Sequence, residues 1–182
     1  MTVAIAVMDY AEAEQRETLS HEQFERFYTL TMPRLRSYIC RVASNEAIAD
    51  DILQESYIRL LNAPPMTERD RKSYLYRVAT NLIRDYWRAE NRRQRWWREW
   101  FRGTTQVRSG GLDLSSDVRQ LFALVSIRER ALLWLAYVEG ADHQEIANTL
   151  HLREKSVKVL LHRARRRMEA VLRKHGFEES DG

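Results

Sequence analysis

Apolar residues recur at intervals of three and four along most of this chain, which is the spacing of one buried face of an α-helix. The clearest stripe begins at Ala49 and continues for three helical turns. Only 6 Gly and 3 Pro interrupt the 182 residues, so few positions break helical structure. The pattern predicts an all-α fold. The residues of the stripe are Ala49, Ile52, Leu53, Ser56, Tyr57 and Leu60.

Capping and helix-breaking residues divide the pattern into elements. Ser20 is placed to cap a first helix, in which Pro33 predicts either a kink or the start of a new helix. Asn45 is expected to open the next helix, which carries the stripe and ends at a turn over 63–66. A long basic helical segment follows.

The segment 103–116 is rich in Gly, Ser and Thr, and it predicts a flexible linker between two small helical domains. The expected division is a loose leader at 1–20, a first domain at 21–102, the linker at 103–116, a second domain at 117–176 and an acidic tail at 177–182.

The segment 142–171 has the pattern of a helix-turn-helix. Asp142 followed by Glu145 is a capping-box pattern for its first helix. Its second helix carries six Lys or Arg residues between Lys155 and Arg167, which suits the DNA major groove. The alternative is a helix hairpin with a solvated basic face. The positions expected to be buried are Ile146, Leu150, Leu152, Val157 and Leu160.

Charge is unevenly distributed along the chain. The net charge is +4, but residues 1–60 hold 6 basic and 10 acidic side chains, so they carry −4 and the remainder carries +8. This asymmetry indicates two kinds of partner surface. The outward side of the striped helix is acidic, and pattern alone favours a solvated face over a docking surface for a basic partner helix. That side presents Asp50, Asp51, Gln54, Glu55 and Arg59.

Aromatic residues are interleaved with arginines over 84–102, which contain seven Arg, three acidic residues and four of the five Trp. Guanidinium groups bind phosphate and aromatic faces stack on unpaired bases, so the mixture fits single-stranded nucleic acid. Tyr86 and Trp87 could instead belong to the core. For Trp96–Phe101, a nucleic acid and a protein partner are equally good interpretations.

Other chemistry is absent from the sequence. Cys40 is the single cysteine, and the five histidines lack zinc-ligand spacing. No phosphate-binding glycine loop, nucleophile motif or paired metal motif is present, so we expect neither enzymatic activity nor a cofactor. The apolar opening MTVAIAVMDY is short and lacks basic residues, so it predicts neither a signal peptide nor a membrane span, and a cytoplasmic location is expected.

Three segments together resemble the extracytoplasmic-function (ECF) sigma factors of bacterial RNA polymerase. AIADDILQESYIRLL resembles their helix that binds core polymerase. SYLYRVATNLIRDYWRAENRR resembles the helix and loop that melt and read the −10 element. HQEIANTLHLREKSVKVLLHRARRRM resembles the helix-turn-helix that reads the −35 element. The resemblance covers about Phe24 to Leu172. It implies a sigma region 2-like first domain, a sigma region 4-like second domain and a factor that directs polymerase to promoters.

The resemblance also implies partners and residue roles. The partners are core RNA polymerase, through its β′ clamp helices and β flap, promoter DNA and an anti-sigma factor, without membrane insertion. Polymerase contacts are expected from Asp50, Asp51, Gln54 and Glu55, and −10 contacts from Asn81, Arg84, Asp85, Trp87 and Arg88. Contacts with the −35 element are expected from Arg153, Lys155, Ser156, Lys158, Val159, His162, Arg163 and Arg166.

Several positions depart from the family pattern. His151 occupies a turn position that usually holds Gly because it needs a positive φ. Arg153 replaces a Ser or Thr cap worth about 1 kcal/mol, and Lys155 replaces a common Gly. The cluster at Trp96–Phe101 is not part of the pattern.

The alternative functions are a stand-alone helix-turn-helix regulator and an adaptor that binds proteins but no DNA.

Overall fold

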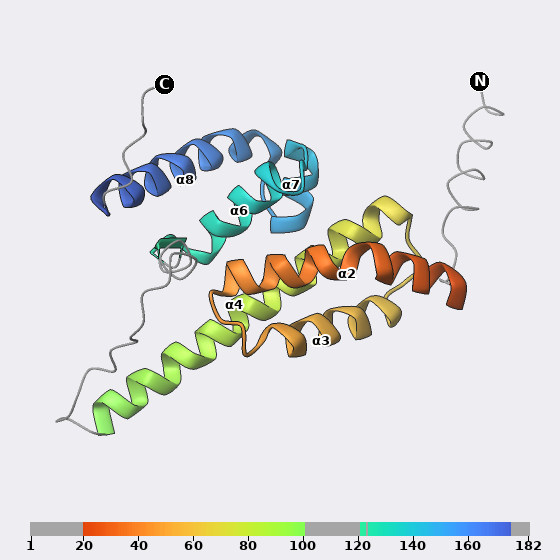
Figure 1. The fold of residues 1–182 in the computed structure, drawn as a ribbon, viewed down its shortest axis with the longest axis horizontal. Coiled ribbons are helices and arrows are strands. Elements are labelled where there is room, and N and C mark those ends of the chain that lie inside the picture. Colours follow the sequence, from red (N-terminus) through yellow and green to blue (C-terminus); the bar gives the residue numbers. More distant parts are fainter. Residues whose placement is uncertain (1–19, 101–120, 123, 176–182) are drawn as a thin grey trace.

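The computed structural model describes residues 20–100, 121–122 and 124–175, with side chains described up to Arg93 in the first range (Figure 1). All regular structure within these residues is helical, which confirms the predicted fold class. None of the described helices is long and apolar enough to cross a membrane. The helices are α2 (His21–Ala43), α3 (Ala49–Leu61), α4 (Glu68–Trp100), α6 (Ile127–Tyr137), α7 (His143–Leu150) and α8 (Glu154–Lys174).

The first helix begins where its capping residue predicted. The Ser20 side chain accepts a hydrogen bond from the Gln23 backbone, and the Gln23 side chain accepts one from the Ser20 backbone. Pro33 lies inside this single helix, so no new helix begins there. The helix ends at Ala43, and Ser44 after it has a left-handed conformation with φ of 52°.

The start predicted for α3 is wrong by four residues, because the helix begins at Ala49 rather than Asn45. The Asn45 side-chain oxygen accepts a hydrogen bond from the Ala47 backbone at 3.0 Å, which forms a local turn instead of a helix cap. The Ala49 N–H bonds the Glu46 carbonyl at 3.1 Å, so the chain enters the helix through this turn. The predicted stripe is confirmed, since all six of its residues are buried.

The first half of the chain packs α2, α3 and α4 together around aromatic and aliphatic side chains. Tyr38 is fully buried and its hydroxyl lies 2.5 Å from that of Thr80, so burial of this ring leaves no unpaired polar atom. Burial raises the pKa of Tyr38, and the phenol stays neutral. The largest buried aliphatic side chains of this half are Leu35, Ile39, Leu75, Ile83 and Val42.

The second half packs α6, α7 and α8 against one another. A capping box between Ser126 and Glu129 starts α6. Leu132 and Leu135 are buried, whereas Val138 is 53% exposed because α6 ends one residue before it. Of the five positions predicted to be buried in the helix-turn-helix, Ile146 and Val157 are fully buried, whereas Leu150, Leu152 and Leu160 are only partly buried.

The two halves are in contact across a seam. Helix α2 packs against α6, and α4 packs against α7 (Figure 1). The apolar core continues through the seam, where the rings of Tyr38 in α2 and Trp134 in α6 lie 6.2 Å apart at a tilt of 67°. The linker predicted at 103–116 lies outside the described residues.

Candidate interfaces for nucleic acid and protein

The acidic side of α3 faces solvent. Asp50, Asp51 and Gln54 are exposed and Glu55 is half-buried. Their positions follow from the stripe, because burying Ile52, Leu53 and Ser56 turns the residues between them outward.

The side chains on the acidic side of α3 differ in whether they already pair with a cation of the same protein. Arg36 in α2 donates from Nε to Asp50 at 2.8 Å and from Nη2 at 3.4 Å, and this guanidinium lowers the pKa of Asp50. Glu55 pairs with Arg59 at 2.7 Å. The side chains of Asp51 and Gln54 make no hydrogen bond or ion pair with any other described residue. We infer that these two are the most available for a partner.

One face of α4 gathers four of the five residues assigned to the −10 element, of which three are exposed and Asn81 is half-buried. Asn81, Arg84, Asp85 and Arg88 follow at i, i+3, i+4 and i+7, so they share a side of the helix. Within this face, Arg84 donates to the Asn81 side chain at 2.9 Å, and Arg88 lies 3.7 Å from Asp85. The buried residues of this stretch, such as Ile83, point the opposite way.

The fifth residue, Trp87, is anchored to the body of the protein. Its indole N–H donates to the Ala43 carbonyl at 3.0 Å, and its ring meets Tyr86 edge-on at 5.5 Å. Tyr86 in turn accepts a hydrogen bond from Asn45 at 3.2 Å. These contacts support the core interpretation of both aromatic residues, although Trp87 stays half-exposed. The side chains of Trp96–Phe101 lie outside the described residues.

The helix-turn-helix has the local geometry that its sequence predicted. Asp142 and Glu145 form the capping box of α7. His151 has φ of 51° and ψ of 54°, so a histidine occupies the left-handed position where glycine is usual. The turn therefore keeps its shape despite the substitution.

Helix α8 presents its basic side to solvent. Val157, Leu161 and Ala164 are buried on one side, and the residues assigned to the −35 element lie on the other. Among them Ser156 is half-buried and Val159 is 51% exposed, so the face combines cations with one apolar contact. The exposed members are Arg153, Lys155, Lys158, His162, Arg163 and Arg166.

Replacing Arg153 with Ser is expected to raise the free energy of unfolding by about 1 kcal/mol while weakening DNA binding. Arg153 is the N-cap of α8 and makes no side-chain cap, so the N–H groups of the first turn lack that partner. A serine would supply the acceptor and remove a cation. Denaturant unfolding and binding to duplex DNA measure the two effects. A variant that lost both stability and affinity would contradict this role.

Sequence patterns missed three residues that connect distant elements. Arg36 holds Asp50 from another helix. Arg130 in α6 is 5% exposed, donates to the Ser44 hydroxyl, and has a pKa lowered to about 10 by burial. Glu139 has a side chain that is only 1% exposed. Helical periodicity describes one helix at a time, and it carried no signal for these contacts between helices.

Comparison with known proteins gives a consistent result. The family model "Sigma-70 region 2" matches residues 27–93, and "Sigma-70, region 4" matches residues 115–168. The chain is 30% identical over 166 residues to the ECF RNA polymerase sigma factor SigX of Bacillus subtilis (strain 168), covering 85% of this chain and 84% of the relative. It is 28% identical over 153 residues to SigL of Mycobacterium tuberculosis (strain ATCC 25618 / H37Rv), covering 76% and 82%.

A solved structure shares the fold. The sigma factor RpoE from Bartonella quintana, in complex with the anti-sigma factor NepR, superposes with a TM-score of 0.65 at 20% sequence identity. The superposition covers 84% of this chain and 98% of that one.

Proposed function

Since this chain belongs to the ECF sigma factors of bacterial RNA polymerase, as its motifs predicted, we propose which of its surfaces performs each step of promoter recognition. The protein is a transcription initiation factor that directs RNA polymerase to promoters. Sigma factors in general are not enzymes, and here the polymerase performs the chemistry. The proposed first domain spans 21–102 and the proposed second domain spans 117–176.

The acidic side of α3 docks on the β′ clamp helices of core polymerase. Support comes from its exposure and from the absence of competing side-chain partners for Asp51 and Gln54 among the described residues. Asp50 contributes less, because Arg36 already neutralises it. A basic partner helix docked here would face the unpaired carboxylate of Asp51 and the half-buried carboxylate of Glu55.

The exposed face of α4 reads the opened −10 element. Arg84 and Arg88 supply cations for the backbone, and Asn81 offers an amide for a base edge. Trp87 acts as a platform with a fixed orientation, because its N–H is already committed to Ala43 and only part of its ring faces solvent.

The outward face of α8 reads the −35 element in the major groove. The buried side of the helix fixes its rotation, so Lys158, His162 and Arg163 face the same groove. Lys and Arg contacts to phosphates release counterions, and binding should therefore weaken as salt rises. Each domain covers few base pairs, so tight binding needs both domains held by polymerase.

Further partners follow from the same assignment. The second domain contacts the β flap, and an anti-sigma factor restrains the protein, as NepR binds the sigma factor of the neighbouring structure. A cytoplasmic location follows because the polymerase and its promoters are there.

The observation that carries the proposal is that both region models match in order and that most residues of the three assigned faces are exposed. The test mixes the purified protein with core polymerase and maps open complexes on a genomic promoter library. We expect a shared pair of −10 and −35 sequences upstream of the opened sites. Failure to associate with core polymerase would refute the proposal. Tight sequence-specific binding to duplex DNA without polymerase would favour a stand-alone regulator.

A further inference from the structure

The end of α2 and the short loop after it contact two consecutive aromatic residues of α4. Figure 1 shows this loop, residues 44–48, crossing α4. Ala43 ends α2, and its carbonyl accepts a hydrogen bond from the Trp87 indole N–H at 3.0 Å. Two residues further on, the Asn45 amide donates to the Tyr86 hydroxyl at 3.2 Å. One short segment therefore holds both aromatic side chains.

The Ala43 carbonyl is available to Trp87 because it lies at the end of a helix. The last four carbonyls of an α-helix have no N–H partner within the helix. Ser44 is left-handed, with φ of 52°, so the chain turns away there instead of continuing α2. The indole N–H supplies the missing donor, and Ala43 is fully buried. Trp87 is thus bonded to a carbonyl whose position is set by the core.

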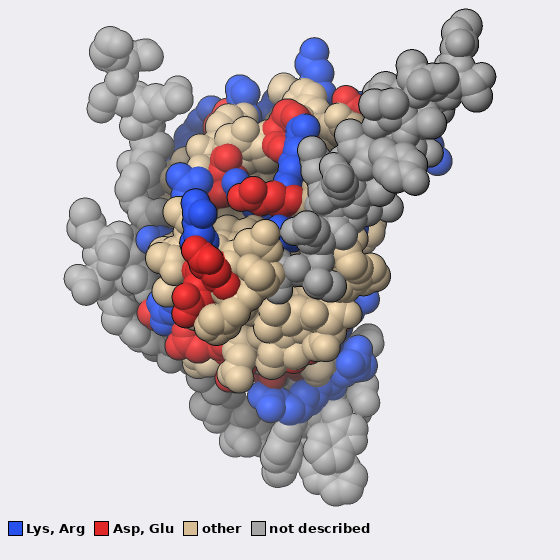
Figure 2. Space-filling view, turned by 90° about the vertical axis from the view of Figure 1, so that its right-hand side faces the viewer, with Lys and Arg blue, Asp and Glu red and all other residues tan. Residues whose placement is uncertain are grey.

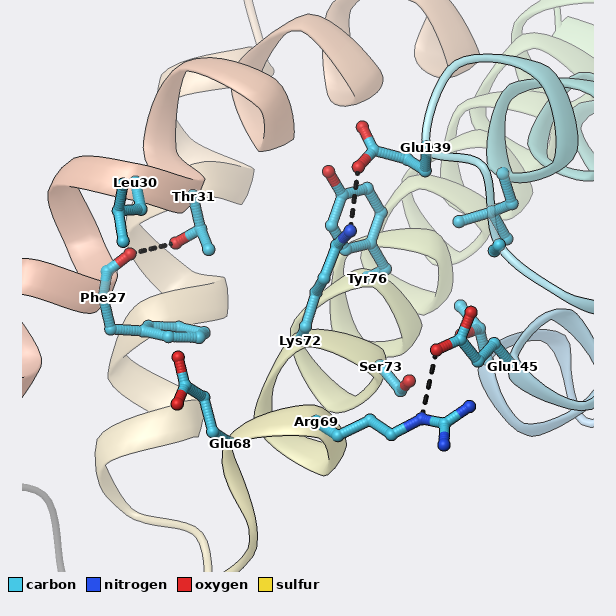
Figure 3. A pocket seen from close by; sticks show the side chains of 13 residues that line it. Phe27, Leu30, Thr31, Glu68, Arg69, Lys72, Ser73, Tyr76, Glu139 and Glu145 are labelled. Carbon is cyan, nitrogen blue, oxygen red and sulfur yellow. Dashed lines mark hydrogen bonds and ion pairs between the residues drawn. The ribbon is translucent and has the colours of Figure 1, made fainter.

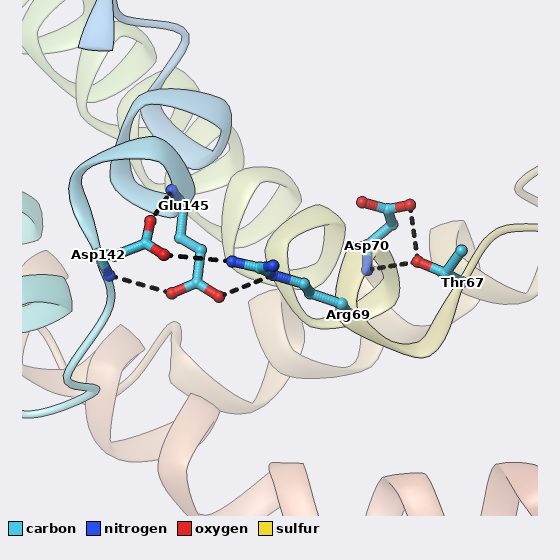
Figure 4. Close-up of polar contacts among 5 residues, drawn as sticks. All are labelled: Thr67, Arg69, Asp70, Asp142 and Glu145. Atoms are coloured by element: carbon cyan, nitrogen blue, oxygen red, sulfur yellow. Dashed lines mark hydrogen bonds and ion pairs between the residues drawn. The ribbon is translucent and has the colours of Figure 1, made fainter. Parts of the chain in front are cut away.

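Asn45 does more than shape its own turn. At the starts of α4 and α7, a side-chain oxygen accepts from the backbone three residues on, in Thr67 with Asp70 at 3.2 Å and in Asp142 with Glu145 at 2.8 Å (Figure 4). Asn45 likewise accepts from a backbone N–H two residues on. Its amide nitrogen, however, donates to a residue 41 positions away. A turn alone does not need that second contact.

Tyr86 links Asn45 to Trp87. The two rings meet edge-on, with centroids 5.5 Å apart and an angle of 81° between their planes. Because the Tyr86 hydroxyl is held by Asn45, its ring cannot swing away from Trp87 without losing that hydrogen bond. Trp87 follows Arg84 by three residues, so it borders the face of α4 proposed to read the −10 element. The Tyr86 ring therefore limits the tilt of Trp87 beside that face.

We propose that Asn45 is a positioning residue for recognition of the −10 element. Through Tyr86 it fixes the tilt at which the half-exposed Trp87 ring meets an unpaired base. The inference rests on the proposed function of α4. Base stacking requires the planes of the base and the ring to be nearly parallel, so a ring that is free to tilt stacks less often. Asn45 acts through the two rings and not through a contact of its own with DNA.

The first test observes Trp87 directly, by fluorine NMR of the full chain labelled with 5-fluorotryptophan. The Trp87 signal is the one that disappears in the variant Trp87→Phe. We expect Asn45→Ala and Tyr86→Phe to shift or broaden that signal, because each removes one partner of the same hydrogen bond. An unchanged Trp87 signal in both variants would overturn the proposal.

The variant Asn45→Asp provides a rescue. One carboxylate oxygen can accept from the Ala47 backbone, as the amide oxygen does at 3.0 Å, and the other can accept from the Tyr86 hydroxyl, which then becomes the donor. The Trp87 signal should return toward its original position. A signal displaced as far as in Asn45→Ala would contradict a role for the Tyr86 contact.

Two control variants make the same chemical changes elsewhere. Asn62→Ala alters the asparagine after α3, whose amide donates to the Ile58 carbonyl at 2.9 Å. That end of α3 lies at the right of Figure 1, on the side of the molecule that Figure 2 shows. Tyr76→Phe removes a hydroxyl from α4 at the pocket between the two halves (Figure 3). Both should leave the Trp87 signal in place, and shifts equal to that of Asn45→Ala would overturn the specific role of Asn45.

The second measurement is the affinity of the complex with core polymerase for a single-stranded oligonucleotide that carries the mapped −10 sequence. Fluorescence anisotropy of the labelled oligonucleotide gives this affinity. Trp87→Ala should lower it about tenfold, as expected for loss of one stacked base. Asn45→Ala should lower it about threefold, the size expected for one aromatic edge contact. In a Trp87→Ala background, Asn45→Ala should cause no further loss.

The outcomes separate this inference from the proposed function. Normal binding by Trp87→Ala would refute the proposed role of Trp87 at the −10 element. A loss in Trp87→Ala without any loss in Asn45→Ala would overturn only the positioning role. Equal losses from Asn45→Ala with and without the Trp87 ring would mean that Asn45 acts on the fold or on DNA itself, and would also overturn the inference.

Discussion

Reversing charge at Asp51 and Glu55 to lysine is expected to lower affinity for core RNA polymerase at least about tenfold, or about 1.4 kcal/mol. Asp51 is exposed and its side chain has no partner among the described residues, so its full charge is available to the proposed polymerase contact. Glu55 already forms an ion pair with Arg59, so its reversal should contribute a smaller part of the lost affinity. Two lysines would repel a basic partner helix, and like charges placed across an interface are strongly unfavourable. Fluorescence anisotropy of labelled protein titrated with core polymerase measures the change.

The fold should survive this change. Asp51 lies in the first turn of α3, where an acidic residue favours the helix, so its reversal costs about 1 kcal/mol. A matched control is Glu22→Lys with Glu25→Lys, since Glu22 lies in the first turn of α2 and Glu25 forms an exposed pair with His21. Equal losses of polymerase affinity in both double variants would mean that net charge matters and the α3 face does not.

Periodicity and capping rules predicted the elements on which these experiments depend. The six-residue stripe of α3 is buried in full because a helix that packs on two neighbours must bury one side, and only one side of that segment is apolar. The left-handed conformation of His151 was expected from the family pattern, which usually has Gly at this position. Local rules sufficed where the outcome depended on neighbours in sequence.

The start of α3 shows where a local rule was ambiguous. Asn45 is as suitable for a side-chain turn as for a helix cap, because both use the same carbonyl oxygen as acceptor. The Asn45 amide also donates to Tyr86, and Tyr86 lies 41 residues away. That distant contact favours the turn, and no pattern within residues 45–62 encodes it.

The seam was beyond sequence reasoning for a related reason. Arg69 and Glu145 are separated by 76 residues, and each is an ordinary exposed residue of an amphipathic helix when its helix is considered alone. Arg130 has a residue type that usually lies at the surface, yet it is buried beside Ser44. Ion pairs between helices depend on how the helices pack in the folded protein, and the pattern of a single sequence does not specify that packing.

Removing two cations from α8, by Lys158→Ala with Arg163→Ala, is expected to lower open-complex formation about tenfold to a hundredfold on promoters that carry a −35 element. Both side chains are exposed and neither belongs to the buried side of α8, so their loss should remove DNA contacts without disturbing the core. Each lost phosphate contact should reduce the slope of log affinity against log salt by about 0.9. Base contacts, at about 1–3 kcal/mol each, would add discrimination between sequences.

The matched control for the α8 variant is Arg167→Ala with Lys174→Ala, which also removes one Arg and one Lys from exposed positions of the same helix. These residues lie toward the C-terminal end of α8, and Lys174 is 16 residues, or about 24 Å, beyond Lys158. A groove-reading face near the turn predicts that the control keeps most promoter use, whereas a general electrostatic effect predicts equal losses. Templates that lack a −35 element provide the second comparison. There the Lys158 and Arg163 variant should match the original chain, and an equal deficit on both templates would mean that α8 acts through polymerase and not through this element.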